Sequence, residues 1–279
     1  IFINILKKKI LIIYEFNKLT GAGHKIRCEI LNKFLKKKNY YIKFINLNNL
    51  NKIKKIHLFS LIILDLKNFK KKIFKKIKKN YKKKIITLDN FQNNLGDLNF
   101  SIFEHNNKLL RSKRFSSLKY AFVRSSLVQK KYTENNFIFI SLGHIINNHK
   151  IRLVKKIKQN NKNLNIVLSP NFNGKVSKNH FSISNQSNYF QYFKRSKICI
   201  TNAGNTVIEA LFLKKKIIVL PQTNKEKIFS DYLVKKKYIM SNNHNDIYKL
   251  NQKLKFKVKN VIDNKGVLRF FKKIKKFIK

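Results

Sequence analysis

Tryptophan is absent from this sequence of 279 residues, and cysteine is rare, with only 2 residues. Cys28 and Cys199 lie far apart, and neither has a cysteine or histidine near it at the spacing of a metal site. The sequence therefore argues against a disulfide framework and against a zinc site. Both cysteines fall in apolar segments, so we expect them to pack as small hydrophobic side chains.

Acidic residues are also scarce, because 12 Asp and Glu stand against 64 Lys and Arg, which gives a formal net charge of +52. Such a charge is typical of nucleic-acid binders. However, lysine far outnumbers arginine, and asparagine, isoleucine and phenylalanine are abundant too. These are the residues that A/T-rich codons encode, so we attribute most of the charge to codon bias. Exposed lysines should still attract nucleotides, RNA or an anionic membrane face.

The basic residues are spread over the whole length, and no RNA-recognition or helix-turn-helix signature accompanies them. We therefore expect no specific nucleic-acid partner, and a polyanion- or RNA-binding protein stays an alternative.

Long apolar runs are missing, and none approaches the roughly 20 residues of a membrane span. The first 13 residues contain three lysines and are typical of a first strand, not of a signal peptide. We expect a cytoplasmic protein, with peripheral contact at the inner face of the membrane as a further possibility.

Short apolar runs alternate with longer amphipathic stretches along most of the chain. A helix is predicted over residues 25–37, from apolar residues at helical spacing. The strands predicted around it cover residues 10–14, 41–47, 61–66 and 85–88. Strand, turn, helix and strand in this order indicate a parallel sheet.

The pattern becomes less regular over residues 91–136 and then restarts. The strands predicted in the second half cover residues 137–142, 164–168, 198–201 and 216–220. We therefore predict two α/β domains, residues 1–130 and 131–279. A last helix, near residues 267–278, has one apolar side and can cap either half.

Glycine positions are informative because the chain has only 7. Gly21, Gly23, Gly143 and Gly204 all follow predicted strands. Parallel sheets bind ligands outside the carboxyl ends of their strands, where glycine allows the backbone to approach a ligand and helix N-termini attract phosphate. Such turns often need glycine for their geometry alone, but four of seven at strand ends favour a ligand crevice between the halves.

His24 follows the first of these turns, at a predicted helix N-terminus that keeps its imidazole neutral. A neutral imidazole can act as a general base, although local capping or packing is the commoner role for such a histidine. Arg27, one turn further, can hold a carboxylate or phosphate or remain solvated. Asp65 and Asp89 each end a buried strand, where an acid is either a helix cap or a site residue.

Asn205 and Thr206 open the helix after Gly204, where they can cap it and touch phosphate. Glu209, one turn on, can accept hydrogen bonds from a ribose diol or simply favour the first helical turn.

Residues 21–28, Gly-Ala-Gly-His-Lys-Ile-Arg-Cys, resemble the GxGHxxRC signature of the UDP-sugar hydrolase of pseudaminic acid biosynthesis. That enzyme belongs with nucleotide-sugar enzymes of the GT-B fold, which include spore-coat-polysaccharide-type glycosyltransferases. Residues 200–211 are similar to the nucleotide-binding turn and helix of this family, and to a segment of the peptidoglycan glycosyltransferase that makes lipid II. The resemblance spans most of the chain in outline.

The resemblance implies two Rossmann-like parallel-sheet domains that face a central cleft, with UDP in the second. It implies hydrolysis of a UDP-linked deoxy amino sugar to UDP and free sugar, with His24 activating water and Asp65 as the second catalytic residue. It also implies that no metal or other cofactor is needed, and we expect a monomer. The predicted substrate- and UDP-binding residues are Gly21, Gly23, Arg27, Gly143, Gly204, Asn205, Thr206 and Glu209.

The chain departs from the family in three places. Glu15 is the nearest match to an early acidic position of the family. Leu66 and Lys67 follow Asp65 where the family has aromatic or histidine residues, and His144 to Ile146 follow Gly143 where it often has glycine and aspartate. These departures keep open a GT-B glycosyltransferase that moves a sugar from a UDP donor to a surface-polysaccharide or lipid-linked acceptor.

Overall fold

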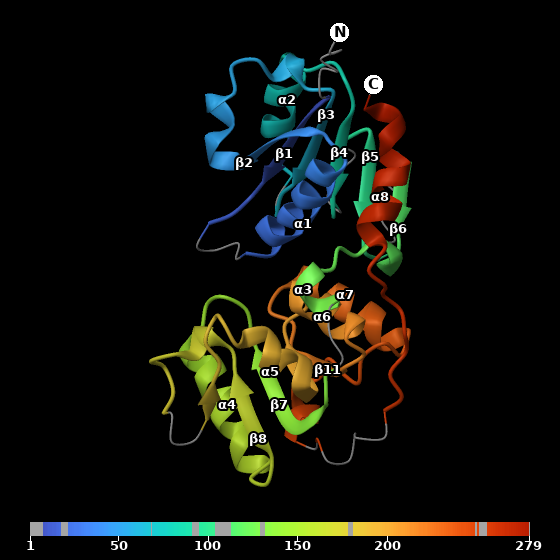
Figure 1. The fold of residues 1–279 in the computed structure, drawn as a ribbon. Coiled ribbons are helices and arrows are strands. Elements are labelled where there is room, and N and C mark those ends of the chain that lie inside the picture. Colours follow the sequence, from blue (N-terminus) through green and yellow to red (C-terminus); the bar gives the residue numbers. More distant parts are fainter. Residues whose placement is uncertain are drawn as a thin grey trace. The chain divides into compact units, whose positions relative to one another are not determined.

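The computed structural model describes two α/β units, each built on its own parallel sheet (Figure 1). One unit combines Ile1–Phe122 with Asn264–Lys279, and the other is Val123–Asp263. The predicted α/β class with two parallel sheets is confirmed. The residues that the structure describes are 8–17, 22–67, 69–90, 95–103, 113–128, 132–177, 181–248, 250 and 256–278.

The first unit contains a six-stranded sheet in the order β2-β1-β3-β4-β5-β6, and all its pairings are parallel. Its strands are β1 (Lys9–Tyr14), β2 (Tyr41–Asn46), β3 (Leu61–Asp65), β4 (Ile85–Leu88), β5 (Leu98–Ser101) and β6 (Lys113–Ser116). Its α-helices are α1 (Gly23–Lys37), α2 (Lys71–Lys79) and α8 (Gly266–Ile274). Short 3₁₀ helices cover Leu47–Lys52, Ile56–Leu58, Leu118–Tyr120 and Lys275–Phe277.

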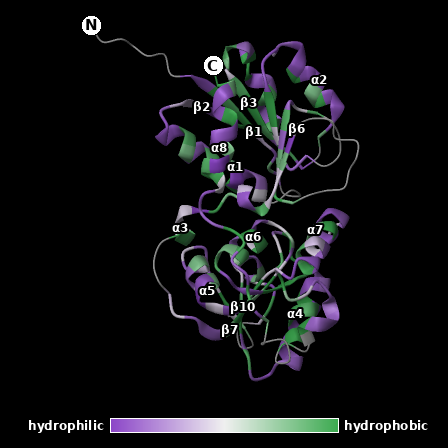
Figure 2. Ribbon diagram, turned by 90° about the vertical axis from the view of Figure 1, so that its right-hand side faces the viewer, coloured by the Kyte–Doolittle hydropathy of each residue, from purple (hydrophilic) through white to green (hydrophobic). Residues whose placement is uncertain are grey.

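β1 and β3 are buried on both faces, which explains why they are continuous apolar runs in the sequence. Ile10 and Ile12 pack on one face of the sheet with α1 and α8, and Leu11 and Ile13 pack on the other face with α2. Figure 2 shows the same division, with hydrophobic colour concentrated in the strands and hydrophilic residues frequent on the helices. The sheet therefore needs helices on both sides to bury it.

α8 belongs to the first unit, whereas the predicted second domain extended to residue 279. The Phe270 ring lies 4.6 Å from that of Phe100 and 5.4 Å from that of Phe122. Gly266 permits this packing, because a Cβ atom there would lie 1.9 Å from the carbonyl oxygen of Ala121. The apolar side of the helix was evident in the sequence, but its partner depended on contacts across almost 150 residues.

The second unit contains a five-stranded parallel sheet in the order β11-β10-β7-β8-β9. Its strands are β7 (Asn135–Ser141), β8 (Asn165–Leu168), β9 (Ser182–Ile183), β10 (Ser196–Thr201) and β11 (Lys216–Val219). Its α-helices are α3 (Ser125–Val128), α4 (Asn148–Asn160), α5 (Tyr189–Arg195), α6 (Asn205–Phe212) and α7 (Asn224–Lys235), and 3₁₀ helices cover Pro170–Phe172 and His244–Tyr248.

The stretch over residues 91–136, which looked irregular in the sequence, supplies β5 and β6 to the first sheet. Both strands have only four residues and carry polar side chains, so they lack an apolar run. The units divide between residues 122 and 123, eight residues before the predicted boundary at 130.

Cys28 and Cys199 are free and buried, one in each unit. Within the described ranges, no cluster of three or more His, Cys, Asp or Glu could hold a metal ion. None of the helices in those ranges combines the length and the apolar character that crossing a membrane requires.

Candidate functional site

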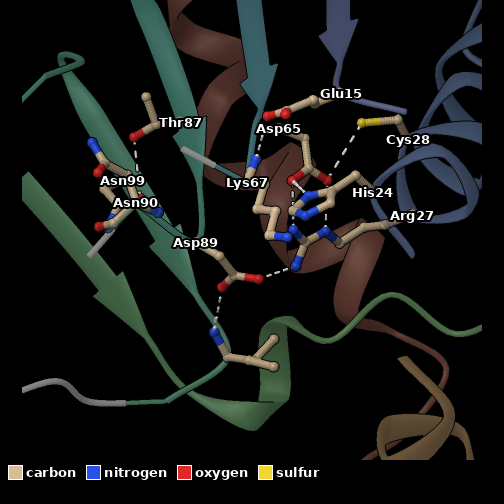
Figure 3. A network of polar contacts seen from close by, with 11 residues as sticks. Glu15, His24, Arg27, Cys28, Asp65, Lys67, Thr87, Asp89, Asn90 and Asn99 are labelled. Atoms are coloured by element: carbon tan, nitrogen blue, oxygen red, sulfur yellow. Dashed lines mark hydrogen bonds and ion pairs between the residues drawn. The ribbon is translucent and has the colours of Figure 1, made fainter. Parts of the chain in front are cut away.

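Three strand ends and one helix start meet at one edge of the first sheet. Asp65 is the last residue of β3, Asp89 follows β4, and Glu15 follows β1. The Glu15 backbone N–H donates to the carbonyl of Asp65 at 3.0 Å, which ties the ends of β1 and β3 together. α1 starts at this edge too, because it follows β1 in the chain, and it brings His24 and Arg27 against the acids (Figure 3).

His24 contacts Asp65 through Nδ1, which lies 2.7 Å from Oδ1 of the carboxylate. The side chain of Asp65 is completely buried, and that of His24 is 17% exposed. Because an ionised carboxylate can only accept, this contact places the proton of a neutral ring on Nδ1 and its lone pair on Nε2. The imidazole is therefore oriented as a base whose active nitrogen is Nε2.

Arg27 and Cys28 supply the other donors to Asp65. Arg27 donates from Nε to Oδ2 at 2.7 Å and from Nη2 to Oδ1 at 2.5 Å, and the Cys28 thiol donates to Oδ2 at 3.6 Å. Burial by itself would raise the pKa of Asp65, but the charges and hydrogen bonds of Arg27 and His24 outweigh it and hold that pKa well below its usual range. Asp65 therefore stays ionised.

Burial, together with the nearby Asp65 carboxylate, raises the pKa of the Cys28 thiol well above its ordinary value. Cys28 is therefore a neutral donor and not a thiolate nucleophile.

Asp89 holds the other end of the Arg27 guanidinium through a very short contact with Nη1. Burial alone would lower the pKa of Arg27, but the two carboxylates raise it well above its ordinary value. Asp89 has a backbone φ of 51°, in the left-handed region that side chains other than glycine rarely adopt. Figure 3 shows the contacts that link the four side chains, from His24 and Arg27 to Asp65 and from Arg27 to Asp89.

The structure thus brings together three predicted site residues, His24, Arg27 and Asp65. Arg27 was expected to contact substrate, but its side chain is 12% exposed and its guanidinium donates to two carboxylates. Gly23 is the first residue of α1, and its N-cap, Ala22, gives no side-chain cap. The predicted binding residue Gly21 lies outside the described residues.

Asp89 had been noticed in the sequence only as an acid at a strand end. Its position in the sequence could have identified it, because Asp89, like Asp65, stands at the end of a buried strand of the same parallel sheet. Glu15, the early acid, accepts the backbone N–H of Lys67 at 2.9 Å and so links the loops after β1 and β3.

The second unit places its predicted residues at the carboxyl edge of the second sheet. Gly143 follows β7 with a φ of 82°, a backbone conformation that favours glycine. Its loop is fixed by side chains: Gln222 donates to the carbonyl of Leu142 at 2.8 Å, and Asn171 donates to that of Gly143 at 2.8 Å. Gly143 is therefore part of a rigid turn.

Gly204 is the N-cap of α6, so Asn205 and Thr206 are its first helical residues and do not cap it as expected. Thr206 hydrogen-bonds Tyr189, whose phenol also bonds Ser141 at the end of β7. Burial raises the pKa of Tyr189 far above its ordinary value, so the phenol is neutral.

Glu209, one turn into α6, is buried and forms an ion pair with Arg124 at 2.7 Å between Oε1 and Nε. Within the described structure its other oxygen, Oε2, has no hydrogen-bond partner. Burial raises the pKa of Glu209 to about 7, against the opposing effect of Arg124. The guanidinium of Arg124 also lies over the Phe190 ring, 4.8 Å from its centre.

No protein-family model matches the sequence, and no curated protein matches it. Several solved structures, by contrast, are similar to this chain. The glycotransferase of kitacinnamycin aligns over 98% of this chain and 99% of its own, with a TM-score of 0.64 and 9% identity. A putative UDP-N-acetylglucosamine 2-epimerase from Listeria monocytogenes aligns over 96% of both chains, with a TM-score of 0.64 and 12% identity.

The UDP-GlcNAc 2-epimerase of Methanocaldococcus jannaschii, solved with UDP-GlcNAc and UDP, aligns over 97% of this chain and all of its own, with a TM-score of 0.60 and 12% identity. These likenesses extend over the whole of both units. They show that the chain has the GT-B fold, the two-sheet architecture of glycosyltransferases and UDP-sugar epimerases.

Proposed function

We propose that this protein is a nucleotide-sugar enzyme that transfers a glycosyl group from a UDP-sugar to an acceptor hydroxyl, with His24 as the base. The observation that carries the proposal is the His24 Nδ1 contact with the buried Asp65, at 2.7 Å, which presents Nε2 as the proton acceptor. The likeness to a glycosyltransferase and to UDP-GlcNAc 2-epimerases supports a UDP-sugar as the donor.

In the proposed reaction, Nε2 of His24 takes the proton of the acceptor hydroxyl as its oxygen attacks the anomeric carbon. The new C–O bond forms while the bond from that carbon to UDP breaks, and UDP leaves with the bonding electron pair. Asp65 stabilises the imidazolium that forms, because Arg27 keeps this buried carboxylate ionised. The positive charge on His24 is therefore matched at the moment it develops.

The second unit is proposed to hold UDP. The proposed contacts come from the rigid Gly143 turn and the start of α6, at Gly204, Asn205 and Thr206, since helix N-termini favour phosphate. Glu209 would accept the ribose hydroxyls through Oε2, a buried oxygen that Arg124 does not contact and that has no hydrogen-bond partner among the described residues.

Hydrolysis of the UDP-sugar to UDP and free sugar is the second candidate. It needs the same base acting on water, and a UDP-linked deoxy amino sugar is its proposed substrate. The observation in its favour is that Arg27 and Cys28, the last two residues of the GxGHxxRC element, both donate to Asp65. The motif is thus built around the carboxylate that orients the base.

One assay separates these reactions. The protein is incubated with a panel of UDP-sugars, with and without lipid-linked and polysaccharide acceptors, and UDP release and sugar products are measured. A transferase releases UDP only with an acceptor, and a hydrolase releases it with water alone. Epimerisation would appear as a new UDP-sugar without UDP release and would replace the transfer proposal. No reaction with any donor would reject all three.

A further inference from the structure

Asp89 lies one step beyond the proposed catalytic pair of His24 and Asp65 (Figure 3). Its contact is with Arg27, which donates to both oxygens of Asp65 through two other nitrogens. Arg27 is therefore shared between two carboxylates. How far its positive charge neutralises Asp65 depends on how firmly Asp89 holds the opposite side of the guanidinium.

The backbone at Asp89 is fixed from the neighbouring strand. The N–H of Asp89 donates to the Phe100 carbonyl at 2.8 Å, and the N–H of Ile102 donates to Oδ1 of its carboxylate at 3.3 Å. The next residue, Asn90, is fully buried and exchanges hydrogen bonds with Asn99 of β5, at 3.2 Å and 2.9 Å. Strand β5 thus maintains the left-handed conformation that points the Asp89 carboxylate at Arg27 (Figure 3).

Left-handed backbone at a side chain other than glycine costs about 1–3 kcal/mol and persists only where its surroundings impose it. Here it places a second buried carboxylate against a guanidinium that already serves Asp65. The Arg27 guanidinium is divided between two carboxylates, so it neutralises Asp65 less completely than it would if Asp65 were its only partner.

We propose that Asp89 is a positioning residue of the His24 base, which acts through Arg27 to hold Asp65 in place and to limit how far the guanidinium neutralises that carboxylate. The role of Asp89 in turnover rests on the proposed function, whereas its effect on the His24 ring does not. Among the described residues, other charged groups near this edge are Glu15 and Lys67, at the ends of β1 and β3, and Lys25 and Glu29 on α1.

The test variant is Asp89→Asn, because asparagine tolerates left-handed backbone and keeps the shape of the side chain while removing its charge. The His24 imidazole is titrated by NMR in the unliganded protein, and its resonance is assigned with His24→Gln. We expect the midpoint of the His24 titration to fall by about 0.5 to 1 pH unit in Asp89→Asn, because the guanidinium that Asp89 no longer shares then neutralises Asp65 more completely.

The matched control is Asp97→Asn. Asp97 also carries an ion pair, with Lys78 and Lys84, but its carboxylate accepts the backbone N–H of Ile85, at the opposite end of β4. This variant should leave the His24 titration unchanged. Thermal unfolding of both variants shows whether each is folded at the temperature of the titration.

A double-mutant cycle tests the route through Arg27. If Asp89 acts through the guanidinium, Asp89→Asn should have much less effect on the His24 titration in an Arg27→Gln background than in the wild type. In an active preparation, Asp89→Asn should lower kcat on the order of tenfold with KM little changed.

Any one of three results would overturn the proposal. The His24 titration of Asp89→Asn could match that of the wild type, or Asp97→Asn could shift it as much as Asp89→Asn does. The shifts caused by Asp89→Asn and Arg27→Gln could also be fully additive in the double variant. Absence of turnover on every UDP-sugar would instead reject the proposed function, and the NMR measurement would still decide the role of Asp89.

Discussion

Asp65 in the first unit and Glu209 in the second are both buried carboxylates beside an arginine, yet their electrostatics are opposite. Asp65 accepts from His24, Arg27 and Cys28 and has a pKa well below its usual range. Glu209 pairs with Arg124 through one oxygen only, and burial raises its pKa to about 7. The number of donors, more than burial itself, decides which acid stays ionised.

This difference matches the two proposed tasks. A carboxylate that must stabilise a developing imidazolium is useful only if it is always ionised, and the first unit surrounds Asp65 with donors. A carboxylate that must accept hydrogen bonds from a ligand needs an oxygen without another partner, and Oε2 of Glu209 is buried with no hydrogen-bond partner in the described structure. The predictions below test this contrast.

The largest expected effect is on the chemical step. Loss of a general base costs about 10²–10⁴-fold in rate, so His24→Gln should lower kcat by that factor. Binding of UDP, measured by calorimetry, should stay within about twofold of wild type, because the second unit is proposed to hold it. A His24→Gln enzyme with wild-type kcat would show that this histidine only packs against Asp65.

Removing the charge of each carboxylate should affect stability very differently. Asp65→Asn removes the carboxylate that pairs with His24 and one of the two that pair with Arg27, and breaking such a buried pair costs about 3–5 kcal/mol. Glu209→Gln should cost about 1 kcal/mol or less near pH 7, because the folded protein holds Glu209 partly protonated there. Urea unfolding, with hydrogen exchange to assign each loss to its unit, measures both. Equal losses of stability in Asp65→Asn and Glu209→Gln would contradict the proposed difference between the two carboxylates.

The pH dependence should also separate the units. Glu209 ionises near 4.5 when unfolded and near 7 when folded, so the folded state binds the extra proton, and stability of the second unit should fall by roughly 3 kcal/mol at most as pH rises through that interval. Asp65 has a lowered folded pKa, so its contribution is complete above 3.8 and is lost only as pH falls below that value.

Hydrogen exchange of amides in β10 and α6, compared with β1 and β3, measures this effect after correction for intrinsic rates. Between pH 5 and 7.5 the second-unit amides should lose protection in the wild type and should keep it in Glu209→Gln. If the second-unit amides of Glu209→Gln still lost protection between pH 5 and 7.5, the pH dependence would belong to another group.

A smaller effect is expected where the last helix joins the first unit. Gly266→Ala should destabilise that unit by about 1–3 kcal/mol, because its Cβ atom cannot fit against the Ala121 carbonyl. Gly174→Ala, at a left-handed position with no heavy atom within 4 Å, is the control for backbone cost alone. Thermal unfolding should show a larger loss for Gly266→Ala, confined to the first unit, and equal losses would mean that α8 moves freely to make room.

The fold was largely predictable because its central strands are unambiguous. β1, β3, β7 and β10 are buried in parallel sheets and appear in the sequence as apolar runs. The four-residue strands β5 and β6 were not predicted, since their polar side chains are satisfied only by partners distant in the chain. Ser101, for example, bonds the hydroxyl of Ser116 at 2.8 Å.

The sequence by itself determined two parallel-sheet units and the grouping of His24, Arg27 and Cys28 on one helix. Helical spacing and the order of strands are local properties, and they are visible in a linear pattern. Asp65 could also be identified from the sequence as a candidate site residue, because parallel sheets bind ligands at the carboxyl ends of their strands.

Only the tertiary structure decided what these residues do to one another. It placed Asp89 opposite Asp65 across the Arg27 guanidinium, and it paired one oxygen of Glu209 with Arg124. It also placed α8 on the first sheet, through ring contacts with Phe100 and Phe122. The physical reason is the same in each case: charge state and packing depend on distances between atoms that lie tens to hundreds of residues apart, and no local pattern records those distances.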